Sequence, residues 1–269
     1  MIVSRVAPDL VNAAALVAER TTALGRPMHL LASTTSTNDE AKRGAKEGAP
    51  HGATWVAEEQ TAGRGRQGRA WTSAAGENLL FSVLLRLACP PSRLPPVAIA
   101  VGLAVRDAVA SAAPGVDARL KWPNDVLVDG RKIAGILVEA VTVGARVEAV
   151  IVGVGINVHT RDFPAELAER ATSLALVGRG AAAVERAVVL ADVLERVDRD
   201  VHVVVARGLG LLRARLDAGD GLRGRRVRND GGDEGEAGGI DDDGRLVVRR
   251  GDGVTARWSA GEVHLVTGV

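Results

Sequence analysis

The chain has 269 residues, of which 46% are hydrophobic and 25% charged, a composition that excludes a disordered or fibrous protein. Its 34 basic and 33 acidic side chains leave a net charge of +1, so no global attraction to DNA or to an anionic membrane is expected. The length suits one large domain and a small one, and a single cysteine, Cys89, excludes an intramolecular disulfide.

The N-terminal segment is predicted to be a helix. Pro8-Asp9 is a typical helix start, and apolar residues then recur at helical spacing up to about Gly25. A short signal sequence over residues 10–18 is the alternative, but Asp9 and Asn12 lie in or against it. The longest apolar runs are about half of the ~20 residues that a membrane span needs. A cytoplasmic protein with no membrane partner is therefore predicted.

The next elements are a strand-like segment, a helix and a strand. Residues 28–32 are apolar and lead into a Ser-Thr-Asn triplet at 36–38. Thr37 and Glu40 have the spacing of a capping box, which predicts a helix from there to about Gly48. Residues 54–58 alternate in polarity as a strand does.

The choice of basic residues is informative. Only four of the 34 are lysines, so each lysine raises a chemical question. Lys42 and Lys46 are predicted to lie on the solvent-facing side of the helix, without a special role. Lys121 and Lys132 flank a motif described below.

The stretch Gly63–Arg69 (GRGRQGR) has no periodicity and is predicted to be a loop. It fits the GxGxxG pattern, but a dinucleotide site needs a helix next and an acidic residue ~20 residues further on. Here a strand follows, and Ala88 stands at that distance. No Gly-Lys-Ser/Thr ends the run, which excludes a P-loop. Three guanidiniums beside exposed amides suit oxyanions such as carboxylates and phosphates; a solvated basic loop or a nucleic-acid contact is the alternative.

The middle of the chain is predicted to alternate strands and helices. Residues 95–112 and 181–216 have apolar faces of helical period. Strands are predicted at 78–87, 120, 126–128, 133–141 and 147–158, with Asp129-Gly130 as a hairpin turn.

The segment Lys121–Asp125 (KWPND) combines a rigid turn with polar side chains. The Trp-Pro pair favours extended backbone, and Lys121 and Asn124 offer a cation and an amide at one place. In an acyl-adenylation a carboxylate approaches an α-phosphate, and a lysine between them would offset their repulsion. A structural turn with a surface lysine is the alternative.

Glycines recur at alternate positions in residues 153–157 (GVGIN), and further glycines lie in residues 130–137. Alternate glycines in a strand remove side chains from one sheet face, so a flat ligand could lie on the backbone. Close packing of a helix over the sheet is the alternative.

The composition changes at residues 217–221, after which five short β-rich segments are separated by Gly/Asp turns. Such a pattern indicates a small β-barrel. Two domains are therefore predicted, residues 1–218 and 219–269.

In combination and in this order, Ser36–Asn38, Gly63–Arg69, Lys121–Asp125, RKIAGIL at 131–137 and GVGIN at 153–157 resemble the biotin protein ligases. The resemblance extends from about residue 30 to the C-terminus. It implies an α/β (α+β) fold with a mixed sheet and helices on one face, as in class II aminoacyl-tRNA synthetases, followed by an SH3-like β-barrel. The implied enzyme is a monofunctional ligase that forms biotinyl-5′-adenylate from biotin and ATP. It then transfers biotin to a lysine of a biotin carboxyl carrier domain.

The resemblance also implies site residues. Biotin would be bound by Ser36, Thr37, Asn38, Gln60, Arg64, Gly65, Arg66, Lys121 and Gly135. ATP would be bound by Arg64, Arg66, Arg69, Trp71, Lys121, Trp122, Asn124, Lys132 and Asn157. Lys121 and Arg66 would be catalytic, and Mg²⁺ would enter through the ATP phosphates. Glu262 matches a barrel position that reaches the nucleotide in some relatives, although Val266 stands where an arginine is often found.

Two rival functions are weighed. A lipoate ligase would use a different arginine- and glycine-rich signature. A DNA-binding repressor would need an N-terminal module of roughly 60 residues, whereas 35 residues precede Ser36, so no DNA partner is expected. The oligomeric state stays open, a homodimer included.

Overall fold

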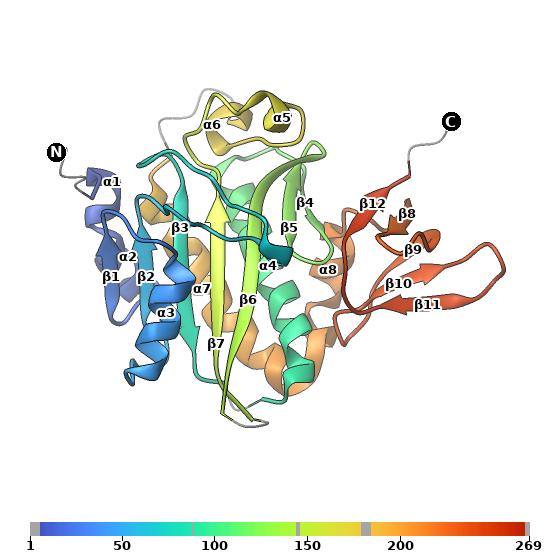
Figure 1. The fold of residues 1–269 in the computed structure, drawn as a ribbon, viewed down its shortest axis with the longest axis horizontal. Helices are drawn as coiled ribbons and strands as arrows, with labels where there is room; N and C mark the ends of the chain where they lie inside the picture. Colours follow the sequence, from blue (N-terminus) through green and yellow to red (C-terminus); the bar gives the residue numbers. More distant parts are fainter. Residues whose placement is uncertain (1–5, 88, 144–145, 179–183, 267–269) are drawn as a thin grey trace.

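The computed structural model describes residues 6–87, 89–143, 146–178 and 184–266 (Figure 1). Its centre is a seven-stranded sheet in the order β1-β2-β3-β7-β6-β5-β4. β1 and β2 are parallel, and every other neighbouring pair is antiparallel. The strands are β1 (Met28–Leu31), β2 (Thr54–Ala57), β3 (Leu79–Leu85), β4 (Ala118–Lys121), β5 (Asp125–Val128), β6 (Arg131–Val143) and β7 (Arg146–Ile156). The predicted mixed sheet is confirmed.

Different helices pack on the two faces of this sheet (Figure 1). The long helices α4 (Leu94–Ala112) and α7 (Arg186–Arg207) pack on one face, and α3 (Thr37–Lys46) lies on the other. Successive strand residues point to opposite faces, so Val150 and Val152 join the core under α4 and α7, whereas Ile151 packs against α3. The loop after β2 crosses the α3 face (Figure 1). The remaining helices are α1 (Pro8–Val11), α2 (Ala13–Arg20), α5 (Ala165–Ala168), α6 (Leu174–Val177) and α8 (Arg213–Gly219), with 3₁₀ turns η1 (Arg66–Gly68), η2 (Pro91–Arg93) and η3 (Gly208–Leu212).

Two predicted helices differ in extent from the observed ones. The N-terminal helix is divided at Asn12 into α1 and α2, because asparagine favours caps over helix interiors. The helix predicted over 181–216 begins, within the described residues, at Arg186, and α7 ends where Gly208 adopts a φ of +71°. η3 and α8 then continue the path, and residues 181–183 lie outside the described residues.

A segment that includes α4, Pro91–Ala112, is long and apolar enough to cross a membrane, contrary to the expectation from the apolar runs. However, 61% of its most apolar window is buried inside the protein. Val97, Val101 and Val105 are fully buried in the main core. α4 is therefore accounted for as the central helix of the fold.

Arg186 joins three elements through a buried ion network. Its guanidinium, 0% exposed, donates to Asp9 of α1 at 2.7 and 2.8 Å and to Glu58, just after β2, at 2.6 Å. Burial opposes ionisation of Asp9, but hydrogen bonds and charge attraction from Arg186 outweigh it and lower the pKa of that carboxyl. The network fixes the chain two residues before Gln60.

The C-terminal part forms a five-stranded antiparallel sheet in the order β11-β10-β9-β8-β12. Its strands are β8 (Arg226–Asn229), β9 (Glu234–Ile240), β10 (Leu246–Arg249), β11 (Thr255–Trp258) and β12 (Val263–Leu265). The five predicted segments are all present. Leu103 of α4 and Trp122 share one hydrophobic cluster with Ile240 and Leu246, so the C-terminal sheet packs directly against the larger part of the molecule.

Candidate active site

The glycines of β6 and β7 lie on the α3 face of the sheet, where Gly135 pairs with Gly155. A Cβ added at Gly155 would lie 2.6 Å from an atom of the Trp71 indole, and one at Gly135 would lie 3.1 Å from the same ring. A Cβ at Gly153 would lie 2.1 Å from Oδ1 of Asn38 in α3. Both interpretations of the glycine pattern therefore hold at different positions. A flat ring lies on Gly135 and Gly155, and a helix packs closely on Gly153.

The start of α3 forms the polar end of this face. Ser36 and Thr37 are buried, and Thr37 donates to Oε1 of Gln60 from its backbone N at 2.8 Å, while its hydroxyl lies 3.1 Å from the same oxygen. The predicted capping box is wrong. Ser36 is the N-cap residue and caps without a side-chain hydrogen bond, while Glu40 accepts from the hydroxyl of Thr34 at 2.8 Å. Thr37 is thus free of capping and holds Gln60.

Lys42 is not a plain solvent-facing residue, which corrects the sequence prediction. Its Nζ lies 2.6 Å from Oε1 of Glu139 on β6. Asn38 donates from Nδ2 to the other oxygen of Glu139 at 2.7 Å. The side chain of Asn38 is therefore held between the helix and the sheet, whereas Lys46 is exposed as predicted.

The three arginines of the Gly63–Arg69 loop point to three different parts of the molecule. Arg64 forms an ion pair with Asp39 of α3, and Arg69 forms one with Glu262 of the C-terminal part. Arg66 donates to Oδ1 of Asn124 at 3.2 Å and to the carbonyl of Gly261 at 3.5 Å. The loop turns back on itself through Gly65, whose N donates to the carbonyl of Arg69 at 2.7 Å. The loop thus connects α3, the β4–β5 turn and the C-terminal sheet.

The two central lysines differ in their surroundings. Lys132 lies 2.6 Å from Asp125 and 5.5 Å from the centroid of the Trp71 ring, a cation–π arrangement. Lys121 ends β4 and is partly exposed. Among the residues that the structure describes, none forms a hydrogen bond or ion pair with its ammonium. Lys121 is therefore the more available cation for a ligand.

The position of Trp122 disagrees with the prediction that this residue binds ATP. Its indole is 1% exposed and donates to the carbonyl of Gly244 in the C-terminal part at 2.9 Å. The ring is enclosed by the hydrophobic cluster at the junction, so it holds the two parts of the molecule together. Asn157 is also buried, and its Nδ2 donates to the carbonyl of Thr172 at 3.0 Å. Asn124 donates to the carbonyl of Ile136 at 2.9 Å.

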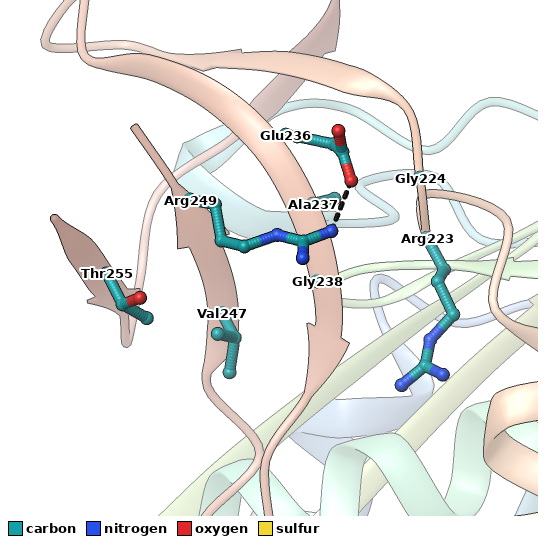
Figure 2. A pocket seen from close by; sticks show the side chains of 8 residues that line it. All are labelled: Arg223, Gly224, Glu236, Ala237, Gly238, Val247, Arg249 and Thr255. Carbon is teal, nitrogen blue, oxygen red and sulfur yellow. Dashed lines mark hydrogen bonds and ion pairs between the residues drawn. The ribbon is translucent and has the colours of Figure 1, made fainter. Parts of the chain in front are cut away.

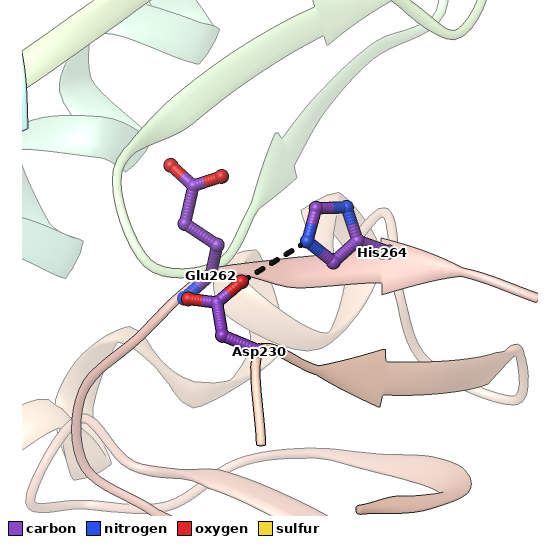
Figure 3. A group of neighbouring side chains, drawn as sticks. All are labelled: Asp230, Glu262 and His264. Carbon is purple, nitrogen blue, oxygen red and sulfur yellow. Dashed lines mark hydrogen bonds and ion pairs between the residues drawn. The ribbon is translucent and has the colours of Figure 1, made fainter. Parts of the chain in front are cut away.

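One group of side chains in the described ranges could hold a metal ion, namely Asp230, Glu262 and His264, whose ligand atoms lie within 4.8 Å of one another. Figure 3 shows Asp230 facing His264, while the carboxylate of Glu262 extends away from them. Hydrogen bonds from His264 and from the backbone N–H of Glu262 lower the pKa of Asp230. Because Glu262 is already paired with Arg69, the group serves as a contact with the loop.

A separate surface cavity of about 420 Å³ lies on the C-terminal sheet (Figure 2). Its lining residues are Arg223, Gly224, Glu236, Ala237, Gly238, Val247, Arg249 and Thr255. All of them come from the C-terminal part, so this cavity is distinct from the α3 face, where the predicted residues gather.

Four polar residues beside the predicted site were missed by the sequence analysis: Asp39, Ser82, Asp125 and Glu139. Ser82 and Glu139 carried a detectable signal, because Ser82 is the one polar residue of β3 and Glu139 interrupts the apolar run 133–141 of β6. Ser82 is fully buried and bonds both Thr37 and Asn38. Asp39 and Asp125 carried no such signal, since acidic residues are common in helix first turns and in turns.

Comparison with known families gives two matches along the chain. Residues 30–157 match the biotin/lipoate A/B protein ligase family. Residues 224–266 match the biotin protein ligase C-terminal domain. The first match includes α3, the arginine loop and β3 to β7, and the second includes the whole C-terminal sheet.

Individual relatives agree with the family matches. The chain is 38% identical over 250 residues to a biotin–[acetyl-CoA-carboxylase] ligase of Mycobacterium tuberculosis, covering 89% of this chain and 90% of the relative. It is 36% identical over 230 residues to the bifunctional ligase/repressor BirA of Bacillus subtilis, covering 84% and 70%. The solved biotin protein ligase of Aquifex aeolicus in complex with biotin and ATP superposes with a TM-score of 0.75 at 29% identity, covering 90% of this chain and 99% of the other.

Proposed function

The chain belongs to the biotin/lipoate A/B protein ligase family, and on that basis we propose that its α3 face binds biotin and ATP. The enzyme is a biotin protein ligase that forms biotinyl-5′-adenylate and transfers the biotinyl group to a lysine. We further propose that this lysine belongs to a biotin carboxyl carrier domain and that the protein acts in the cytoplasm. The division at residue 219, where α8 ends, remains a proposal for the domain boundary.

The polar residues at the start of α3 favour biotin over lipoate as the substrate. The buried Ser36 and Thr37 and the partly exposed Gln60 place hydroxyl and amide groups in one small region. The ureido ring of biotin can hydrogen-bond to such groups, whereas the dithiolane of lipoate cannot. A site built to hydrogen-bond its substrate strongly rejects an analogue that leaves its polar groups unpaired. We propose that Ser36, Thr37 and Gln60 bind the ureido ring.

The other end of the face is proposed to bind the nucleotide. Trp71 offers a ring over Gly135 and Gly155, and Lys132 lies above that ring. Arg64, Arg66 and Arg69 of the loop lie between the proposed biotin end and the proposed nucleotide end of this face. Charge-assisted bonds from arginine suit carboxylates and phosphates. This placement supports Arg64, Arg66, Arg69, Trp71 and Lys132 among the predicted ATP residues, whereas the buried Trp122 and Asn157 gain no support from it.

The reaction proceeds in two steps. The carboxylate oxygen of biotin attacks the α-phosphorus of ATP, the bond to the bridging oxygen breaks, and pyrophosphate leaves. The lysine amine of the carrier then attacks the acyl carbon, an amide forms, and AMP departs. Binding both substrates on one face supplies orientation, and we propose that the arginine loop keeps water from the mixed anhydride.

Magnesium is proposed to enter with the phosphates. The carboxylates beside the site are engaged, Asp39 by Arg64 and Asp125 by Lys132. A ready set of oxygen ligands is therefore not formed by these groups, and Mg²⁺ commonly binds through one or two carboxylates and substrate phosphates. When bound, it would neutralise phosphate charge.

We expect Gly155→Ala to raise the KM for ATP about threefold and to leave the KM for biotin nearly unchanged. The added Cβ would meet the Trp71 indole at 2.6 Å, so the ring must move off the sheet. Steady-state kinetics with each substrate varied would measure the effect. Gly251→Ala is the matched control, because nothing lies within 4 Å of a Cβ there. An unchanged KM for ATP in a folded Gly155→Ala variant would separate Trp71 from nucleotide binding.

The decisive test of the proposed function is ATP-dependent transfer of labelled biotin to a biotin carboxyl carrier domain, with lipoate as the competing substrate. Labelling of the carrier that requires ATP and is unaffected by lipoate supports the proposal. Transfer of lipoate in preference to biotin would contradict it. DNA binding is not proposed, because the described N-terminal helices pack on the core and Asp9 of α1 is held by Arg186.

A further inference from the structure

A continuous chain of hydrogen bonds runs across the α3 face behind the proposed biotin site. Glu139 of β6 accepts from Lys42 at 2.6 Å and from Nδ2 of Asn38 at 2.7 Å. Oδ1 of Asn38 lies 2.5 Å from the hydroxyl of Ser82, and that hydroxyl lies 2.7 Å from the hydroxyl of Thr37. These hydrogen bonds connect the carboxylate of Glu139 to Thr37, the residue proposed to bind the ureido ring.

The three central residues of this hydrogen-bond chain are buried and tightly positioned. Ser82, Thr37 and Asn38 are at most 4% exposed. Asn38 can approach the sheet only because Gly153 has no side chain, since a Cβ there would lie 2.1 Å from Oδ1. Polar groups at such burial need their hydrogen bonds satisfied, so the donor and acceptor at each step are fixed by their neighbours.

Glu139 stays ionised in this setting. Burial favours the neutral acid, but hydrogen bonds from Lys42 and Asn38, with the charges of Lys42 and Arg64, outweigh it and lower the pKa of the carboxyl. An ionised carboxylate can only accept hydrogen bonds. It therefore requires the NH₂ group of Asn38 to face it and the carbonyl oxygen to face Ser82.

The direction of this first hydrogen bond then determines which group donates at each following step. Because Oδ1 of Asn38 can only accept, the single hydroxyl proton of Ser82 is donated to it. Ser82 has no second proton, so the 2.7 Å contact between the two hydroxyls is a hydrogen bond only if Thr37 donates to Ser82. With its proton held there, the oxygen of Thr37 presents lone pairs to a ligand.

We infer that Glu139 is a positioning residue that sets the hydrogen-bond direction of this chain, so that Thr37 presents an acceptor to a ureido N–H of biotin. The inference rests on the proposed function, because it deepens the role given to Thr37. Glu139 itself acts through Asn38 and Ser82 and touches no substrate.

Glu139→Gln tests the inference because it keeps the shape of the side chain. Lys42 can then be satisfied only by the amide oxygen, so the amide NH₂ faces Asn38, which must turn over. The turned Asn38 donates to Ser82 and Ser82 donates to Thr37, so the proton of Thr37 is no longer held by Ser82 and is free to point at the ligand, where it opposes a ureido N–H. We expect the KM and Kd for biotin to rise about five- to tenfold, with kcat and the KM for ATP within twofold of the unmodified enzyme.

Two further variants complete the experiment. Glu148→Gln, the same change at a half-exposed carboxylate of β7, is the matched control and should leave every constant unchanged. Ser82→Ala breaks the chain without altering charge, and we expect it to weaken biotin binding to a similar extent.

The outcomes separate the two claims. If the unmodified enzyme transfers biotin, and folded Glu139→Gln and Ser82→Ala bind it within twofold of normal, the inference is wrong and the proposed function stands. If the unmodified enzyme neither binds nor transfers biotin, the proposed function fails. Should Glu139→Gln not fold, Ser82→Ala decides the inference by the same criteria.

Discussion

Replacing Lys121 by alanine is expected to slow biotinyl-adenylate formation by about 10²–10³-fold or more, with the fold intact. The lysine ends β4, and no other described residue pairs with its ammonium. Its removal therefore breaks no internal ion pair. In the proposed reaction it would lie between the biotin carboxylate and the α-phosphate, where negative charge develops on phosphorus. Removing one such preorganised donor typically costs about 2.7–4 kcal/mol of transition-state stabilisation.

Biotin-dependent exchange of pyrophosphate into ATP measures this step directly. Lys46→Ala is the matched control, because Lys46 is an exposed lysine at the end of α3, away from the sheet face. Circular dichroism and thermal unfolding would establish that both variants are folded. Near-normal exchange by a folded Lys121→Ala variant would remove Lys121 from the catalytic step.

Replacing Arg66 by glycine is expected to weaken retention of the adenylate by about ten- to a hundredfold while still allowing it to form. Arg66 contacts Asn124 of the β4–β5 turn and Gly261 of the C-terminal part, so its loss removes both of these contacts. A charge-assisted bond to the phosphate, about 1.5–3 kcal/mol, would be lost as well. A further glycine also adds backbone freedom to a loop that already contains three.

The expected sign of this leakage is free biotinyl-adenylate in solution and biotin on bystander lysines when no carrier is present. Dissociation of the adenylate from the purified enzyme can be followed by single-turnover chase with unlabelled biotin and ATP. Arg249→Gly is the matched control, because Arg249 is an exposed arginine on the C-terminal sheet. A dissociation rate equal to that of the unmodified enzyme would assign the Arg66 guanidinium another role.

Thr37 and Trp122 show the limits of local patterns. The spacing of Thr37 and Glu40 indicated a capping box, yet both side chains bond residues outside the helix start. Trp122 was grouped with the ATP residues because it lies within KWPND, but its ring fills the junction with the C-terminal sheet. In each case the local pattern was correct about the backbone and wrong about the partner of the side chain.

The sequence by itself determined the elements and the family. The apolar β-branched runs at 133–141 and 147–158 lie in β6 and β7 as predicted, Asp129-Gly130 forms the predicted turn with φ of 50° and 77°, and the glycine-rich motifs occur in the order typical of the ligases. These properties depend on residues close together in the chain. Local preference therefore suffices for them.

The tertiary structure decided which side chains act together. Lys42 and Glu139 are 97 residues apart and Asn38 and Glu139 are 101 apart, so no local pattern could pair them. Their contact depends on α3 lying across β3 and β7, beside β6, which in turn depends on Gly153 leaving room for Asn38. The partner of a buried polar group is chosen by whatever the fold places beside it, because such a group must be satisfied there.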